Sequence, residues 1–394
     1  MNEKKIEFFK RRLSRDSEIG EKGTRDSYAT RYFEETKDKE YEDIRPPFFR
    51  DTDRIVHSKA YARYIDKSQV FYGINNANIT HRSLHVVIVS RVARQIGRIF
   101  RLNTDLIEAI ALGHDIGHPF ASHLGESILD SYSRKYGLGR FQHNAQGIRW
   151  LARLEKRFPE QPAKGLNLTL QVLDGILCHD GEVDERTLKP LNRDKTWADH
   201  FAEYEDCFNE NKILRIPMTY EGIVVRFADV IAYIGRDVED AILLNYIDRS
   251  DIPQRVKRRL GDTNRQIMNN LIMDLIDFSL DKDVIGYSEP IFEALKELKA
   301  FNYENIYLRK DEAFKSKITK EFDLIFKKSL KALEEEDYEA PIFKDHVEYI
   351  DDKKYSTYYQ PLKEANKLTL IVRDYIAGMS DKYFNEIYKV LSNS

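Results

Sequence analysis

Residues 106–126 read LIEAIALGHDIGHPFASHLGE, and this stretch determines the fold expected for the rest of the chain. Apolar residues recur at helical spacing up to the adjacent pair His114 and Asp115, and Gly117 and Pro119 predict that the helix ends there. Three of the ten histidines of the chain lie in this stretch. An imidazole beside a carboxylate at the end of a helix predicts a site for a divalent cation such as Mn, Fe(II) or Mg.

The composition is that of an ordinary soluble protein with a large core. The chain has 394 residues, of which 42% are hydrophobic and 33% charged, and its net charge of -3 gives no overall attraction to nucleic acid or to an anionic membrane. The two cysteines, Cys178 and Cys207, favour a reducing compartment over a disulfide framework. Without a signal-peptide pattern or an apolar run of membrane-spanning length, we expect a cytoplasmic protein that makes no use of a membrane.

The chain is expected to divide into three parts. Residues 1–45 are highly charged and are interpreted as a solvated surface arm, which ends where Pro46 and Pro47 disfavour helix. Residues 46–250 hold the predicted site. Residues 251–394 continue in helical periodicity, and strand signals are scarce throughout, so the sequence predicts an all-α fold with additional C-terminal helices that pack on the core.

A second helix is predicted from His81, with Thr80 as a candidate cap. Its apolar residues form one stripe with His81 at its head: Leu84, Ile88, Val92, Ile96 and Ile99. A histidine that opens an apolar stripe is, taken alone, more often a core residue than a ligand. His85, on the same helix, is interpreted as structural.

A third helix is predicted over residues 221–244, and one of its faces carries Asp229, Tyr233 and Asp237 at intervals of four residues. The neighbours of Asp229 are apolar, and burial of its carboxylate would be costly unless it is paired or binds a metal. The alternative is a buried aspartate bonded to an arginine such as Arg226.

Together these helices offer two imidazoles and two carboxylates to one cation: His81, His114, Asp115 and Asp229. Such an incomplete shell leaves coordination positions for water and a substrate oxygen. A structural zinc site would normally recruit cysteines and close with four ligands, and neither cysteine of this chain lies near the other in sequence.

The order His…His-Asp…Asp on helices resembles the HD phosphohydrolase superfamily, and longer motifs resemble its deoxyguanosine triphosphate or dNTP triphosphohydrolases. Each motif alone is weak, but the ordered set is specific and covers the chain from about residue 45 to its C-terminus. The matching segments are FRD (49–51), KSQVF (67–71), THRSL (80–84), HDIGHP (114–119), HLGE (123–126), HNAQ (143–146), GLNLT (165–169), ADVIAY (228–233) and DYIAGMSD (374–381).

The resemblance implies an HD-domain fold and the hydrolysis of a deoxynucleoside triphosphate to the deoxynucleoside and inorganic triphosphate. It implies that a divalent metal is held by His81, His114, Asp115 and Asp229. It also implies a homo-oligomer.

The resemblance further implies roles for residues around the metal. His123 matches the proposed proton donor, Glu126 would orient it or raise its pKa, and His118 and His143 match histidines near the phosphates. Gln69, Tyr233 and Asp237 match positions near the sugar. The alternatives are ordinary helix packing for Tyr233 and a surface position for Asp237.

Relatives usually carry arginines just before the first metal histidine, where this chain has Asn76 and Asn78. Asparagine cannot replace the bidentate, charge-assisted contact of arginine with phosphate. The phosphates would then be contacted by other basic residues: Arg50, Arg54, Lys67 or Arg82.

Two alternatives remain open from the sequence. One is an HD phosphohydrolase that acts on a nucleoside monophosphate, a cyclic nucleotide or a guanosine tetraphosphate alarmone. The other is a non-catalytic HD protein that binds nucleotides or single-stranded nucleic acid, which the net charge does not support.

Overall fold

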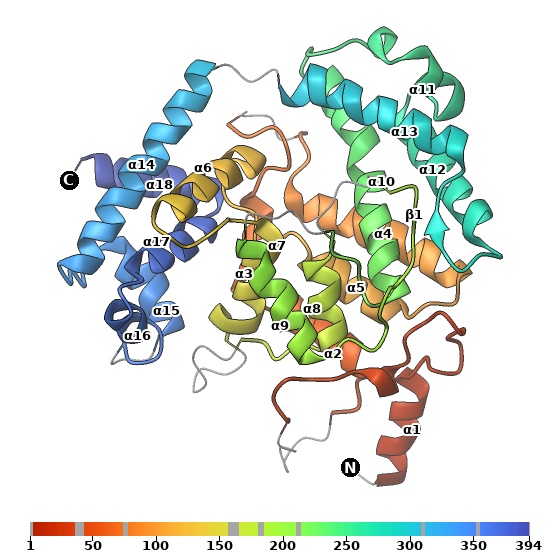
Figure 1. Ribbon diagram of the computed structural model, residues 1–394, viewed down its shortest axis with the longest axis horizontal. Helices are drawn as coiled ribbons and strands as arrows, with labels where there is room; N and C mark the ends of the chain where they lie inside the picture. Colours follow the sequence, from red (N-terminus) through yellow and green to blue (C-terminus); the bar gives the residue numbers. More distant parts are fainter. Residues whose placement is uncertain are drawn as a thin grey trace.

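The computed structural model describes residues 3–35, 43–73, 78–156, 165–179, 185–209, 214–308, 312–351 and 355–393. Helices form almost all of the regular structure in these residues, so the predicted all-α fold is confirmed (Figure 1). The described strands are β1 (Thr187–Leu188) and β2 (Ile285–Gly286), which pair antiparallel. None of the described helices is long and apolar enough to cross a membrane.

The helices run in chain order as α1 (Glu3–Leu13), α2 (Pro47–Val56), α3 (Lys59–Ala62), α4 (Arg82–Ile99), α5 (Thr104–Gly113), α6 (Ser122–Lys135), α7 (His143–Arg149), α8 (Leu170–Leu177), α9 (Trp197–Glu205), α10 (Tyr220–Leu243), α11 (Gln254–Arg259), α12 (Asn264–Ser279), α13 (Glu289–Asn302), α14 (Glu312–Glu334), α15 (Glu348–Ile350), α16 (Tyr359–Glu364), α17 (Leu368–Ala377) and α18 (Asp381–Ser392). Short 3-10 or π-helical turns that matter below are η2 (Arg63–Asp66), η3 (Trp150–Leu154), η6 (Tyr303–Tyr307) and η7 (Phe343–Val347).

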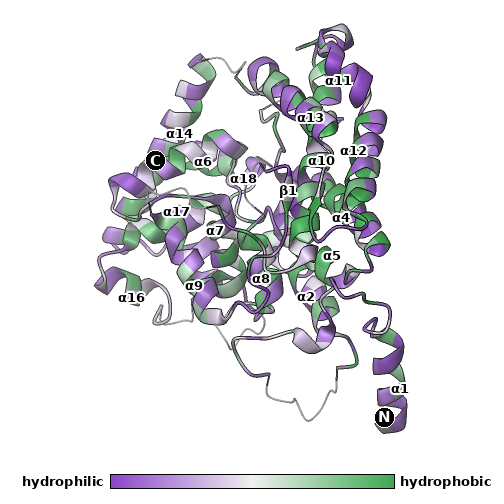
Figure 2. Cartoon of the chain, turned by 45° about the vertical axis from the view of Figure 1, so that its right-hand side comes forward, coloured by the Kyte–Doolittle hydropathy of each residue, from purple (hydrophilic) through white to green (hydrophobic). Residues whose placement is uncertain are grey.

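Helix α10 lies at the centre of the molecule and packs against α4, α5, α8 and α12. It is apolar on several faces, and Ile223, Val224, Phe227 and Ile231 are fully buried, as expected for a helix surrounded by others. Figure 1 shows α11 to α13 beside α10 on one side of the molecule and α14 to α18 on the opposite side. Apolar residues concentrate toward the interior, and hydrophilic ones cover the outward faces (Figure 2).

Helix α4 buries only part of the predicted apolar stripe. Of the predicted stripe, Val92 and Ile96 are buried, whereas Leu84 and Ile99 are 43% and 47% exposed. The buried positions follow the helical spacing that starts at Arg82 and passes through His85. The predicted stripe was therefore right at Val92 and Ile96 and wrong at its two ends, and at the start of α4 the core-facing side is rotated to His85.

The His-Asp turn after α5 is set by local chemistry. The side chain of Asn103 caps α5 by accepting hydrogen bonds from the first backbone N–H groups of the helix. Gly117 follows the turn where α7 approaches closely, and a Cβ there would lie 1.9 Å from the carbonyl oxygen of His143. Ala121, just before α6, and Ser122, its first residue, then take left-handed φ values of 61° and 50°.

The N-terminal segment is attached to the core rather than free over much of its length. The backbone N–H and the hydroxyl of Thr24 both donate to the buried carboxylate of Glu221, at 2.8 and 2.9 Å. The guanidinium of Arg31 donates to Asp51 at 2.7 Å. The predicted surface arm is thus wrong for this part of the segment, and residues 36–42 lie outside the described residues.

Among the C-terminal helices, α14 and α17 pack against α6. A buried network joins them to α7, where Asp374 accepts hydrogen bonds from Arg149 and Gln146. The ammonium group of Lys67 donates to the carbonyl oxygens of His118 and Ala377, at 2.6 and 3.3 Å. The division into parts at residues 45 and 250 stays a prediction.

Candidate metal and active site

Three helical elements bring two histidines and two aspartates together in the core. His85 lies on α4, His114 and Asp115 follow α5, and Asp229 lies on α10. The Nε2 atom of His85 is 2.9 Å from Asp229 Oδ1 and 3.7 Å from Asp115 Oδ2. The Nε2 atom of His114 is 3.4 Å from Asp115 Oδ1 and 3.7 Å from Asp229 Oδ1. Donor atoms this close together can share one divalent cation.

His81 lies outside this cluster, and His85 takes the place expected of it. His81 is the residue before α4 and forms an isolated bridge with the backbone of Ser68, while no described contact joins it to Asp115 or Asp229. The physical reason is the rotation of α4 described above, since the buried face of this helix contains His85. The first candidate ligand is therefore corrected from His81 to His85.

The state of His114 suits metal coordination. Its Nδ1 atom lies 2.7 Å from the carbonyl oxygen of Ala111, which can only accept, so Nδ1 carries a proton. Its Nε2 atom is then left with a lone pair, and this buried atom has no hydrogen-bond partner among the described residues. A histidine ligand is commonly fixed in this way by a bond from its other nitrogen.

The two aspartates are held in the ionised form that a metal needs. Burial by itself would raise the pKa of Asp115, but Arg82 and His114 lower it overall. For Asp229, burial is likewise outweighed by the adjacent rings of His114 and His85, and its pKa falls well below its ordinary value. Metal binding is favoured by such deprotonated ligands.

A second histidine group lines the space beside this cluster. The ring of His118 stacks on that of His143, with centroids 3.7 Å apart, and its Nε2 atom is 3.4 Å from Asp115 Oδ1. His143 Nε2 in turn lies 3.1 Å from Nε2 of His179, just beyond α8. Burial, together with Arg82 and His143, holds the pKa of His118 well below its ordinary value. The ring of His118 is thus kept neutral.

His179 was missed by the sequence analysis. Its Nδ1 atom donates to the carbonyl oxygen of Ile176 at 2.6 Å, which leaves Nε2 free to face His143. A signal was present in the sequence, because His179-Asp180 is a second adjacent His-Asp pair that follows an apolar helix. Asp180 itself lies outside the described residues.

Glu126 lies between two histidines. It accepts from the backbone N–H of His143 at 2.8 Å and lies 3.0 Å from the Nδ1 atom of that ring. Its other oxygen is 3.8 Å from Nδ1 of His123, whose side chain is 78% exposed. Although burial opposes it, His143 and His123 keep the pKa of Glu126 low. The expected proximity of His123 and Glu126 is present, and the shorter contacts of Glu126 are with His143.

A cavity of about 630 Å³ opens beside both groups, with room for a nucleotide. Its lining contains these predicted site residues: Gln69, Asp115, His118, His123, His143, Asp229, Tyr233 and Asp237. Asp237 accepts a hydrogen bond from Tyr307 of η6 at 2.6 Å, and burial raises its pKa to about 7. The alternative of a surface position for Asp237 is excluded, since this residue is 2% exposed.

Arg50 is not brought to this cavity, and its predicted contact with substrate is corrected. Its guanidinium pairs with Glu35 at 2.6 Å, and Arg50 is not among the residues that line the cavity. The physical reason is that α2 places Arg50 beside the carboxylate of the N-terminal segment, which neutralises it. Arg54 pairs with the same carboxylate.

Arg82 does line the cavity. It is buried, and it donates to Asp115 and, at 3.1 Å, to the hydroxyl of Ser122. Counted from His85 instead of His81, Arg82 stands three residues before the first candidate ligand, so an arginine is present just ahead of that ligand after all. Asn76, one of the two positions from which arginine had been judged missing, lies outside the described residues.

A further group of potential metal ligands is already paired with a lysine of the protein. Asp174, Cys178 and Glu203 lie within reach of one another. The ammonium group of Lys195 is 2.8 Å from both Asp174 and Glu203, so an internal ion pair occupies this position. The cluster around Asp115 is therefore the better candidate for a metal.

Comparison with known proteins agrees with this geometry. Residues 82–234 match the HD domain family. This range contains all four candidate ligands, with His85 in place of His81. A deoxyguanosinetriphosphate triphosphohydrolase-like protein of Clostridium tetani is 33% identical over 359 residues, 88% of this chain and 87% of that protein. A protein of the same description from Caldanaerobacter subterraneus is 35% identical over 90% of this chain and 87% of its own. One from Leptospira interrogans is 29% identical over 90% and 92%. The chain therefore belongs to the deoxyguanosinetriphosphate triphosphohydrolase-like proteins, a family of HD-domain, metal-dependent phosphohydrolases.

Proposed function

We propose that this protein hydrolyses deoxynucleoside triphosphates to the deoxynucleoside and inorganic triphosphate. The observation that carries the proposal is the cavity itself, whose lining contains Asp115 and Asp229 of the His/Asp cluster as well as Tyr233 and Asp237. The cavity can therefore contact the triphosphate and the sugar of one nucleotide through different residues. The printed names of the relatives agree with this substrate class.

The candidate ligands of the cation are His85, His114, Asp115 and Asp229. When bound, a divalent cation supplies charge neutralisation and Lewis-acid polarisation of a phosphoryl oxygen. Mn, Mg and Fe(II) all accept mixed imidazole and carboxylate ligands and are the candidates.

Phosphate is positioned by groups of the chain near this cluster. Arg82 presents a buried guanidinium to the cavity, and the adjacent rings of His118 and His143 add further nitrogen donors. Lys315 of α14 lines the same cavity and supplies a second cationic side chain. These groups would stabilise the charge that develops on the phosphoryl oxygens during the reaction.

His123 is proposed as the general acid. In the reaction a water oxygen bonds to the α-phosphorus, the bond from phosphorus to the 5′-oxygen breaks, and that oxygen needs a proton. His123 is the exposed histidine of the set, so it can recover a proton from solvent after each turnover. Its Nδ1 atom lies 3.8 Å from Glu126, which orients the ring and leaves Nε2 for the leaving oxygen.

The sugar is assigned to the part of the cavity that contains Tyr233 and Asp237. Asp237 Oδ2 is bonded to the hydroxyl of Tyr307, and among the described residues no hydrogen bond engages its Oδ1 atom. This oxygen is available to a 3′-hydroxyl group, with the Tyr233 ring and Gln69 beside it. A nucleotide without a 3′-hydroxyl would lose this bond.

Product analysis tests the proposal. The protein is incubated with dGTP and each of Mn, Mg and Fe(II), and the products are separated by ion-exchange chromatography. Deoxyguanosine and triphosphate in equal amounts are expected, whereas pyrophosphate or single phosphate would point to another HD phosphohydrolase.

The role of His123 is tested with His123→Ala beside His57→Ala, an exposed histidine at the end of α2. We expect His123→Ala to keep its bound metal and to lose turnover by about 10²–10⁴-fold, the usual contribution of a general acid. His57→Ala should match the wild type. Full turnover in His123→Ala would remove its role as the acid.

A further inference from the structure

We propose that the turn between α17 and α18 positions Gln69 for the sugar of the substrate, with Asp381 as the positioning residue. This role rests on the proposed function, which assigns Gln69 to the sugar. The turn belongs to the segment DYIAGMSD (374–381), which resembles the family in sequence, yet none of its residues lines the catalytic cavity. Any effect of this segment on the reaction must therefore pass through other residues.

Three consecutive residues before Gln69 are each bonded to this turn or to the first turn of α18. The pairs are Asp66 with Lys382, Lys67 with Ala377, and Ser68 with Asp381. Asp381 makes two of these bonds with a single atom, because its Oδ2 accepts from the backbone N–H and from the hydroxyl of Ser68, at 3.1 and 2.5 Å. The loop of residues 66–68 is thereby held in a fixed position on the C-terminal helices.

The same loop borders the catalytic cavity. The backbone N–H of Arg82 donates to the carbonyl oxygen of Lys67 at 2.8 Å, and the ammonium group of Lys67 donates to the carbonyl oxygen of His118 at 2.6 Å. Gln69 lines the cavity, and its backbone N–H donates to the carbonyl oxygen of Thr80 at 3.3 Å. Its Oε1 atom is buried and has no hydrogen-bond partner among the described residues. This atom is available to a hydroxyl group of the sugar.

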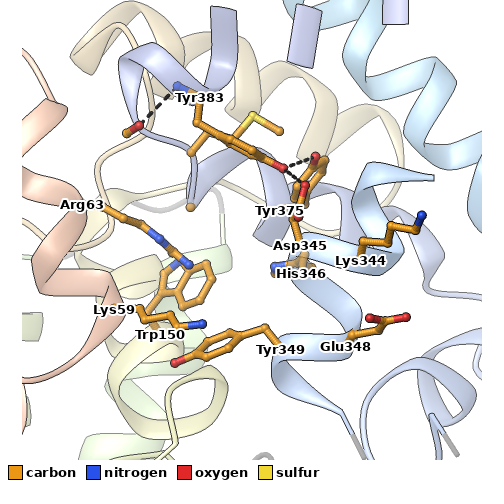
Figure 3. Close-up of a pocket in the computed structure, with 13 residues that line it drawn as sticks. Lys59, Arg63, Trp150, Lys344, Asp345, His346, Glu348, Tyr349, Tyr375 and Tyr383 are labelled. Carbon is orange, nitrogen blue, oxygen red and sulfur yellow. Dashed lines mark hydrogen bonds between the residues drawn. The ribbon is translucent and has the colours of Figure 1, made fainter. Parts of the chain in front are cut away.

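The turn can fix the loop because the turn is itself held in place. Figure 3 shows the hydroxyl of Tyr383, in α18, bonded to Asp345 of η7 and to the hydroxyl of Tyr375 in α17, the latter at 2.9 Å. Gly378 packs so closely on Trp150 of η3 that a Cβ at this position would lie 2.4 Å from the ring. The turn is therefore tied to three other elements, and the loop is tied to the turn.

The chemistry of Asp381 predicts which substitutions matter. Asp381→Ala leaves the N–H and the hydroxyl of Ser68 without their acceptor, so the next residue, Gln69, should sample more orientations and lose part of its contact with the sugar. Asparagine keeps an oxygen that can accept both bonds. Asp381→Asn should therefore behave as the wild type, which separates the loss of the bonds from the loss of the charge.

A double-mutant cycle with dGTP and Mn tests whether Asp381 acts through Gln69. We expect Gln69→Ala and Asp381→Ala each to raise KM by about 3–10-fold, the usual value of one hydrogen bond, with kcat little changed. In the double variant KM should rise no further than in Gln69→Ala alone. Glu386→Gln changes an exposed carboxylate of the same helix and should match the wild type.

The proposal is overturned if Asp381→Ala keeps the KM of the wild type, or if its effect adds in full to that of Gln69→Ala. Equal losses in Asp381→Asn and Asp381→Ala would also overturn it, because the bonds to Ser68 would then not be the cause. If Asp381→Ala does not fold, Ser68→Ala removes the hydroxyl bond from the other side. It should raise KM in the same direction, and an unchanged KM would overturn the proposal.

Hydrogen exchange of the protein without substrate separates this proposal from the proposed function. In Asp381→Ala, or in Ser68→Ala in its place, exchange should become faster in peptides that cover residues 66–72 and stay unchanged in α5 and α10. If the wild type forms no triphosphate from dGTP, the proposed function fails, while this local change would still show that the turn fixes the loop. Unchanged exchange at residues 66–72, or faster exchange throughout the core, would overturn the positioning role.

Discussion

His85 shows how a single side chain decides where the metal site forms. Its ring reaches both Asp229 and Asp115, while His81, only four residues earlier, reaches neither. We expect His85→Ala to lose metal affinity and turnover by at least on the order of a hundredfold, since even residues behind the ligands contribute about 10–100-fold.

His81→Ala is the matched control on the same helix end and should keep its metal. Metal content by mass spectrometry and turnover with dGTP measure both variants. Loss of metal in His81→Ala with retention in His85→Ala would restore the ligand set expected from the sequence.

The buried carboxyl of Asp237 predicts a pH-dependent stability. Burial, and to a lesser extent Asp240, raise its pKa from 3.8 to about 7. Between these values the folded state holds more protons than the unfolded chain, so this group makes stability fall as the pH rises through that window. Asp237→Asn removes the effect, which amounts to up to about 4 kcal/mol above pH 7 at ~1.4 kcal/mol per pKa unit.

Thermal unfolding of wild type and Asp237→Asn at pH 4 and pH 8 measures this effect. The melting temperature of the variant should exceed that of the wild type at pH 8, and the difference should shrink toward zero at pH 4. Asp277→Asn, at an exposed position of α12, is the control for general charge effects. An equal difference at both pH values would show that Asp237 does not titrate in this window.

Most candidate site residues were recognisable from the sequence, because their chemistry is carried by local motifs. The pair His114-Asp115 and the four-residue spacing of Asp229, Tyr233 and Asp237 each specify one face of one helix. A local motif does not show which residue, distant in sequence, its side chain will contact. Arg50 was predicted to contact the substrate. Its own motif does not reveal that its guanidinium pairs with Glu35 instead.

At the scale of elements, helix α4 illustrates a limit of periodicity. Apolar residues stand on more than one of its faces, and Val87, Leu84 and Ile99 are each more than 40% exposed. An apolar stripe along α4 could therefore include either His81 or His85. Only the packing of α4 against α5 and α10 selects the face that carries His85. Helices α5 and α10 were predicted more accurately, since burial on several sides makes their phase less important.

The buried pair of Asp374 and Arg149 joins helix α17 to α7, which carries His143. Arg149 Nη2 is 2.6 Å from Asp374 Oδ2, and the hydroxyl of Tyr358 donates to the same carboxylate at 2.9 Å. Asp374→Ala leaves a buried guanidinium uncompensated, so we expect a loss of about 3–5 kcal/mol in the free energy of unfolding.

Urea unfolding measures this loss, with Asp277→Ala as the exposed control, expected within about 0.5 kcal/mol of the wild type. Two separate unfolding transitions in Asp374→Ala would indicate that the C-terminal helices and the core unfold independently. An unchanged midpoint would contradict the stabilising role of the pair.

At the scale of the whole molecule, the resemblance to the family leads us to propose a homo-oligomer. The C-terminal helices α14 and α18 are candidates for the contact surface, and Val390 of α18 is 54% exposed. Size-exclusion chromatography with light scattering should give a mass that is a multiple of the 46.4 kDa chain. A mass equal to one chain at micromolar concentration would contradict this prediction.

The all-α architecture followed from the sequence because helical periodicity persists from end to end. The attachment of the N-terminal segment to the core was not predicted, because the charged composition of this segment is typical of a solvated arm. The bonds from Thr24 to Glu221 depend on a carboxylate almost 200 residues away, and no local pattern announces such a contact. Long-range polar pairs of this kind are the main part of the fold that the sequence left undetermined.

The central claim is that one divalent cation is held by residues of α4, α5 and α10 beside the catalytic cavity. Crystals grown with Mn and measured for anomalous scattering test it most directly. We predict a single strong peak within coordination distance of His85 Nε2, His114 Nε2, Asp115 and Asp229, and its absence in Asp229→Ala crystals. A peak at Asp174, Cys178 and Glu203 instead, or no peak at the Asp115 cluster at saturating Mn, would contradict the account.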